Sequence, residues 1–153
     1  MRPSNRYSSW TLLKFVLALS WLLAACGDPR ASWTAEDKEN IAHFFASQKA
    51  DLAAVRLSNS GVAFSAMPEA ERTEMLRLKR LALSEAKLLK DEVLSKANRD
   101  LPQRFRELYQ RSLELRLRNL EIGDIEAELK GSALHDQWVD WYNANKSAIK
   151  IPK

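Results

Sequence analysis

A row of large aliphatic residues recurs every seven positions through the centre of the chain. The row consists of Leu101, Leu108, Leu115, Ile122 and Leu129. Seven residues make about two turns of an α-helix, so these side chains lie along one side of a helix. The row therefore predicts a long helix that buries this side against its own domain or, as a coiled coil, against a partner or a second copy. Because the companion positions Ser112, Asn119 and Glu126 are polar, we favour packing within the domain.

Apolar residues at three- and four-residue spacing predict two helices before this row. The first begins near Ala35, after a capping box formed by Thr34 and Asp37, and ends before Asn59. The second begins at Pro68, a residue that suits the first turn of a helix, and continues for about thirty residues without a helix breaker.

The third helix is predicted to start beside Asp100 and Pro102, and Gly123 either interrupts it or starts a new helix. Gly131 is expected to end it, because glycine is common just past a helix end. A last helix is predicted over residues 133–147. The short connection before Pro102 makes an antiparallel pairing of the second and third helices natural, although one helix with a kink at Pro102 is the alternative.

Composition agrees with an all-α fold. The chain of 153 residues contains only 4 glycines and 5 prolines, and no segment alternates with period two for long enough to suggest a strand. We therefore expect a small helical bundle of about four helices, dominated by a long antiparallel helical hairpin.

The first residues have the regions of an export signal. The positive segment carries Arg2, Arg6 and Lys14, and the apolar stretch FVLALSWLL follows at Phe15–Leu23. This stretch is too short to span a bilayer, which needs about 20 apolar residues. It ends in Leu23, Ala24, Ala25 and Cys26, and this sequence resembles the lipobox of bacterial lipoprotein precursors.

The resemblance implies that signal peptidase recognises Leu23, Ala24 and Ala25 and that lipid, including palmitate, is attached to Cys26. Residues 1–25 would then be a cleaved signal peptide, residues 26–33 a lipidated tether, and residues 34–153 a single helical domain. A lipid anchor implies a place in the cell envelope. Since Gly27 rather than aspartate follows the cysteine, the periplasmic face of the outer membrane is favoured in a Gram-negative host. In a Gram-positive host the anchor implies the outside of the cytoplasmic membrane.

The charge of the chain gives no reason to expect a nucleic-acid partner. The whole chain has 24 Lys and Arg against 20 Asp and Glu, but three of the basic residues lie in residues 1–25, which contain no acidic residue. The remainder has 21 basic against 20 acidic residues and is nearly neutral. Basic patches that bind nucleic acid need a clear positive excess.

Two groups of side chains are candidates for an interaction surface. The aromatic group is Trp138, Trp141 and Tyr142, and the basic group is Arg104, Arg111 and Arg118. The rings share one side of the last predicted helix and either lock that helix onto the bundle or stack against a sugar. The arginines would meet lipid headgroups or an acidic partner.

No catalytic, cofactor or metal motif is present in the sequence. Glu39 lies one turn before His43, but two ligands do not make a metal site without a third. The same holds for His135 and its neighbour Asp136. We therefore expect a non-enzymatic, membrane-anchored protein without a cofactor, whose helical domain binds or scaffolds another envelope protein or a second copy. The alternative is a ligand- or glycan-binding envelope module that uses the C-terminal rings.

The lipobox makes a direct prediction about Cys26. A Cys26→Ser variant lacks the thiol that accepts the lipid, so it should remain unprocessed and incorporate no labelled fatty acid in a bacterial host. Labelling equal to that of the unaltered chain would contradict the lipoprotein assignment.

Overall fold

The computed structural model describes residues 33–58 and 63–152. Leu23, Ala24, Ala25 and Cys26 lie outside the described residues. Residues 34–153 form one compact unit, and its regular elements in the described ranges are all helical. The predicted all-α, small helical bundle is thus confirmed. Within the same ranges, no helix is both long enough and apolar enough to cross a membrane.

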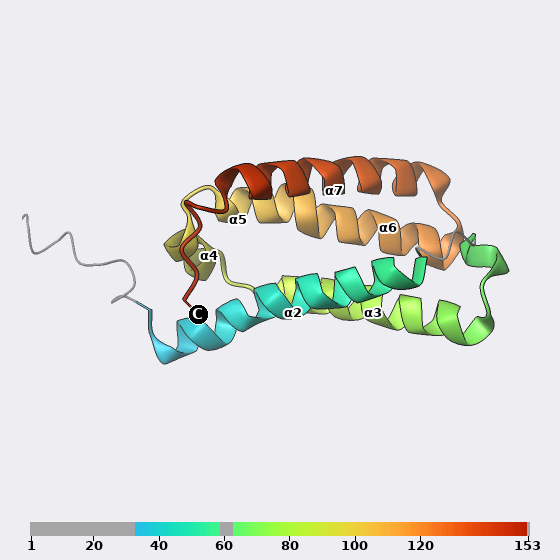
Figure 1. The fold of residues 1–153 in the computed structure, drawn as a ribbon, viewed down its shortest axis with the longest axis horizontal. Helices are drawn as coiled ribbons and strands as arrows, with labels where there is room; N and C mark the ends of the chain where they lie inside the picture. Colours follow the sequence, from blue (N-terminus) through green and yellow to red (C-terminus); the bar gives the residue numbers. More distant parts are fainter. Residues whose placement is uncertain (1–32, 59–62, 153) are drawn as a thin grey trace, which may run out of the picture. The chain divides into compact units, whose positions relative to one another are not determined.

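The unit opens with two helices that pack against each other, α2 (Ala35–Ser58) and α3 (Glu69–Leu88) (Figure 1). The predicted capping box starts α2. The Thr34 amide donates to Asp37 Oδ2 at 2.8 Å, and the Asp37 amide donates to Thr34 Oγ1 at 3.1 Å. These reciprocal bonds satisfy amides that a helix leaves unpaired at its start. A 3₁₀ turn at Phe64–Ala66 leads towards α3.

The second half of the unit is a continuous helical run followed by a returning helix. After the short α4 (Asp91–Ala97), the run comprises α5 (Leu101–Arg104), the π-helical segment η3 (Phe105–Gln110) and α6 (Arg111–Ile122). The last helix, α7 (Ile125–Asn145), packs along α6. Figure 1 shows α2 and α3 in one layer and α6 and α7 in the other. Helix α3 packs against α6, whereas α2 and α7 make little backbone contact.

The seven-residue row is divided between the core and the surface. Its first three members, Leu101, Leu108 and Leu115, are buried, whereas Ile122 and Leu129 are exposed. Gly123 ends α6 in the left-handed conformation with a φ of 73°, which suits a residue without a Cβ. Asp124 then starts α7 by accepting a hydrogen bond from the Ala127 amide at 2.9 Å. The glycine thus turns the chain, and the row no longer follows one helix.

Gly131 does not end a helix, so this prediction was wrong. Helix α7 runs through it and starts at Ile125 rather than near residue 133. A Cβ at Gly131 would lie 2.8 Å from Arg116 Cγ and 3.1 Å from Leu115 Cβ on α6. The residue lacks a side chain because α6 and α7 approach each other closely at this point.

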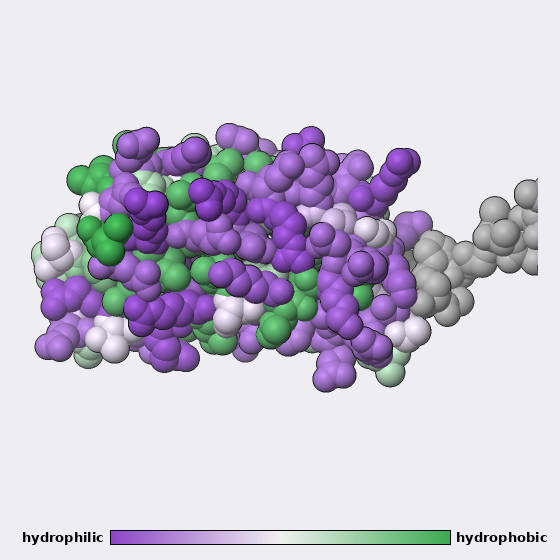
Figure 2. Space-filling model, turned by 180° about the vertical axis from the view of Figure 1, so that it is seen from behind, coloured by the Kyte–Doolittle hydropathy of each residue, from purple (hydrophilic) through white to green (hydrophobic). Residues whose placement is uncertain are grey.

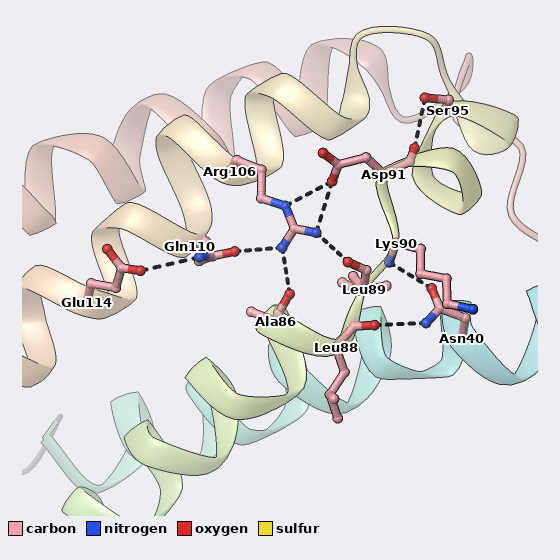
Figure 3. Close-up of polar contacts among 10 residues, drawn as sticks. All are labelled: Asn40, Ala86, Leu88, Leu89, Lys90, Asp91, Ser95, Arg106, Gln110 and Glu114. Carbon is pink, nitrogen blue, oxygen red and sulfur yellow. Dashed lines mark hydrogen bonds and ion pairs between the residues drawn. The ribbon is translucent and has the colours of Figure 1, made fainter.

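The predicted thirty-residue second helix is also divided, because Leu89 and Lys90 separate α3 from α4 (Figure 3). Asn40 on α2 bonds to both sides of this break. Its Nδ2 donates to the Leu88 carbonyl at 2.8 Å, and the Lys90 amide donates to its Oδ1 at 2.9 Å. The amide side chain satisfies backbone groups that a continuous helix would have paired internally.

Arg106 in η3, which belongs to the other layer, also bonds to residues at the break between α3 and α4. Its guanidinium donates to the Ala86 carbonyl at 2.9 Å and to the Leu89 carbonyl, and its Nε donates to Asp91 Oδ1 at 2.9 Å (Figure 3). The last carbonyls of a helix have no partner within that helix. A planar fork of several N–H donors can serve them together, which a lysine ammonium cannot do with the same geometry.

Replacing Arg106 should therefore destabilise the bundle more than its partial exposure suggests. We expect Arg106→Lys to lower the free energy of unfolding by about 1–3 kcal/mol, because a buried carbonyl loses its donor. The measurement is urea unfolding followed by circular dichroism.

Arg111→Lys is the matched control on the same helical run. Arg111 is exposed and pairs only with the nearby Glu114, at 2.9 Å, so its replacement should cost less than about 0.5 kcal/mol. Equal losses in the two variants would show that the carbonyl contacts of Arg106 contribute nothing particular to stability.

Candidate functional site

Trp138 on α7 is the centre of a cluster of aromatic rings that joins both layers. Its ring lies 5.4–6.4 Å, between centroids, from the rings of Phe44, Phe105, Tyr109, Trp141 and Tyr142. Such separations are typical of favourable ring pairs. Trp138 is only 3% exposed, so of the two roles considered for it, its ring locks α7 onto the bundle and offers no stacking surface. Its partners Trp141 and Tyr142 are half-buried.

Beside this cluster lies a cavity of about 270 Å³, which we call the α2–α7 pocket. Its lining comprises Gln48, Asp51, Leu52, Val55, Tyr109, His135, Trp138, Val139, Tyr142 and Asn143. Most of these side chains are aromatic or aliphatic, and a few polar groups stand among them. This is the usual composition of a small-molecule or side-chain binding site.

The polar side of the pocket belongs to a set of buried and half-buried ionisable groups, the charge cluster, formed by Asp51, Lys79, Arg116 and His135. Lys79 donates a hydrogen bond to Asp51 Oδ1, and both side chains are buried. Arg116, 14% exposed, places Nη1 3.8 Å from Asp51 Oδ2. Burial is the main cause that lowers the pKa of Lys79, and Asp51 opposes that shift.

His135 lies at the edge between the charge cluster and the pocket. Its Nδ1 is 4.0 Å from Asp51 Oδ2, and it is buried without a hydrogen-bond partner among the described residues, as is Arg116 Nη1. Burial first, and then the positive charge of Arg116, lower the pKa of His135 below its usual 6.5. The ring is accordingly neutral at pH 7.

The segment η3 brings Tyr109 against the same cluster. Its hydroxyl lies 3.2 Å from Ser47 Oγ, which in turn donates to the Ala82 carbonyl at 2.7 Å. Burial raises the pKa of Tyr109, with the Asp51 carboxylate adding to the rise. The phenol is therefore a neutral, fixed wall of the pocket.

The predicted basic surface is divided into separate contacts. Arg104, Arg111 and Arg118 are all exposed, but two of them are already paired. Arg111 bonds to Glu114 at 2.9 Å, and Arg118 lies 2.8 Å from Asp124. A nearby carboxylate reduces the attraction of each arginine for another anion.

Three exposed aliphatic residues lie at the end of α6 and in the first turns of α7, and we call them the apolar corner. Ile122, Ile125 and Leu129 are 69%, 72% and 69% exposed. Figure 2 shows hydrophobic side chains at this end of the bundle. Large aliphatic side chains scattered singly are common on surfaces, whereas a group of them usually marks a contact with another molecule.

The described residues contain no group of three His, Cys, Asp or Glu side chains that could hold a metal ion. His43 does not face Glu39 as a ligand pair. Its Nδ1 lies 2.6 Å from Glu85 Oε2 on α3 instead, so the two helices share this contact.

No protein-family model matches the chain, and neither the curated proteins nor the solved structures include one that is similar to it.

The charge cluster was not predicted from the sequence, although part of its signal is present there. Asp51 follows Phe44 and Ser47 at helical spacing on the buried side of α2, and Lys79 lies between Met75 and Ala82 on the buried side of α3. A charged residue in an apolar stripe has to be paired, because burying an isolated charge is costly. The spacing alone does not say which charge is the partner.

The environment of His135 predicts the pH dependence of stability. The free energy of unfolding should fall as the pH is lowered from about 7 to about 5. The unfolded chain takes up a proton near the ordinary pKa of about 6.5, whereas the lowered pKa in the folded state resists that proton. Proton uptake on unfolding therefore favours the unfolded state in acid.

His135→Gln removes the titrating group and keeps a hydrogen-bonding amide. Urea unfolding at several pH values should show a shallower slope for this variant over the same range. A slope equal to that of the unaltered protein would mean that His135 does not contribute to it.

Proposed function

We propose that this protein is a lipid-anchored component of the bacterial cell envelope whose helical domain, without enzymatic activity, binds another protein through the apolar corner. The anchor rests on the lipobox ending in Cys26. The binding function rests on one observation, which is the exposure of Ile122, Ile125 and Leu129 as a group.

The exposure of these residues is informative because the same row is buried elsewhere. Leu108 and Leu115 are each only 8% exposed, while the next members of the row, Ile122 and Leu129, face solvent. Leaving an aliphatic side chain in water forgoes about 1.5–3 kcal/mol of burial free energy. A partner that covers the corner would recover this free energy.

Charged residues that suit the rim of an interface are close to the corner in the sequence. Arg118, Asp124, Glu126 and Lys130 line a depression together with Leu115 and Ala127. Protein interfaces commonly have an apolar centre and a polar rim. The corner also lies at the opposite end of the bundle from the start of α2 (Figure 1).

For the location, we propose attachment to the periplasmic face of the outer membrane in a Gram-negative host, on the basis of Gly27. The partner is another envelope protein or a second copy of the chain.

Photo-crosslinking in the native envelope tests this proposal. A photoreactive phenylalanine analogue at Ile125 should give adducts of defined mass, because the corner is in contact with a partner. The mass of the adduct distinguishes a second copy from another protein.

The matched control places the same analogue at Glu92, which is also exposed on a helix but lies on α4. Adducts should form from position 125 and not from position 92, and the double substitution Ile122→Ser with Leu129→Ser should reduce them at least tenfold. No adduct from position 125, or the same adducts from both positions, would overturn the proposal.

A further inference from the structure

The two layers of the bundle face each other along two pairs of helices, and we call the boundary within each pair a seam. One seam is closed and the other is open. Helices α3 and α6 pack directly, whereas α2 and α7 make little backbone contact. At one end of the open seam, the Phe44 ring lies 6.4 Å from Trp138 and 6.2 Å from Tyr142. Beyond these rings the seam contains the α2–α7 pocket, with a volume of about 270 Å³.

The pocket has the size of a small ligand. An apolar cavity of about 150 Å³ in a folded protein is enough to hold benzene. The α2–α7 pocket therefore has room for one aromatic ring and a short substituent. Larger ligands of drug size generally need about 300–1,000 Å³.

The walls of the pocket are already in place. Trp138 is held by five neighbouring rings, and its centroid lies 5.4 Å from those of Tyr109 and Tyr142, which also line the pocket. Leu52 and Val139 form the outer rims, and both are exposed. A guest would meet side chains that are already packed, which lowers the entropic cost of binding.

The polar side of the pocket is balanced in charge. Asp51 is paired with Lys79 and lies near Arg116, and a second carboxylate, Glu128, borders a smaller cavity with the same two cations. His135 is neutral at pH 7. Two carboxylates thus balance two cations, so neither a cationic nor an anionic guest would find an unpaired counter-ion to offset its loss of water.

The atom Asp51 Oδ2 lies near two nitrogen atoms without a hydrogen bond to either of them. Asp51 Oδ2 is 3.8 Å from Arg116 Nη1 and 4.0 Å from His135 Nδ1, and both separations exceed hydrogen-bond length. Both nitrogens lack partners among the described residues. A hydroxyl can donate to a carboxylate oxygen and accept from a nitrogen donor at the same time.

We propose that the α2–α7 pocket binds a small neutral aromatic alcohol, whose ring packs against Leu52 and Tyr142 and whose hydroxyl donates to Asp51 Oδ2. This site is separate from the apolar corner, and it does not depend on the protein-binding function.

Four probes with the same phenylethyl body test the assignment. The probes are 2-phenylethanol, ethylbenzene, 2-phenylethylamine and phenylacetate, which differ only in the group that meets Asp51. Each probe is titrated into the ¹⁵N-labelled full-length protein, solubilised in detergent. Binding is followed by NMR through the indole N–H signals of the tryptophans. We expect saturable binding of 2-phenylethanol, at least tenfold tighter than that of the other three.

A matched pair of variants locates the site without disturbing the charge cluster. Val139→Trp fills the pocket from its rim, whereas Asp140→Trp adds the same ring at the next position of α7, which is exposed and does not line the pocket. Val139→Trp should weaken binding of 2-phenylethanol at least tenfold, and Asp140→Trp should leave it unchanged. Circular dichroism confirms that both variants remain folded.

Four results would overturn the proposal. Equal binding of ethylbenzene would remove the role of the hydroxyl, and tighter binding of the amine or of phenylacetate would remove the preference for a neutral guest. Absence of saturable binding by all four probes, or equal effects of the two tryptophan variants, would show that the pocket is not the site.

Discussion

The charge cluster constrains the arrangement of the bundle because each of its four members comes from a different helix. Asp51 lies on α2, Lys79 on α3, Arg116 on α6 and His135 on α7. A buried charge that loses its partner costs several kcal/mol. Sliding α2 or α3 by one turn would move its member of the cluster by about 5.4 Å and leave a charge unpaired. The cluster therefore acts against alternative registers that the apolar stripes alone would tolerate, since leucine and alanine pack in many ways.

Close approach of α6 and α7 is the second requirement of this cluster. Gly131 lets α7 lie directly against the backbone of α6 at Arg116, where a Cβ would fall 2.8 Å from the arginine side chain. The stem of Arg116 consequently passes beside α7, and its head points towards Asp51 on α2. A residue that looks like a helix end in the sequence thus serves packing, and it does so because of a contact between two different helices.

Short-range sequence patterns correctly predicted those features of the fold that are held by hydrogen bonds between residues close in the sequence. The capping box of Thr34 and Asp37 and the turn at Gly123 are examples, since the bonds involved span only three or four residues. The break between α3 and α4 depends instead on Asn40 and Arg106, which lie far from it in the sequence. The apolar spacing of the second predicted helix continues through Leu89, so it contains no sign of the break.

The candidate site was predictable only in its residue types. The rings of Trp138 and Tyr142 stood out, but spacing on one helix could not distinguish a surface from a core position, because that depends on the layer opposite. Helix α7 is fixed to α6 at Gly131 and to α2 through the contacts of Phe44 with Trp138 and Tyr142. Between these two points it lies clear of the α2 backbone. The pocket is thus a consequence of fixing one helix at two places to two different neighbours.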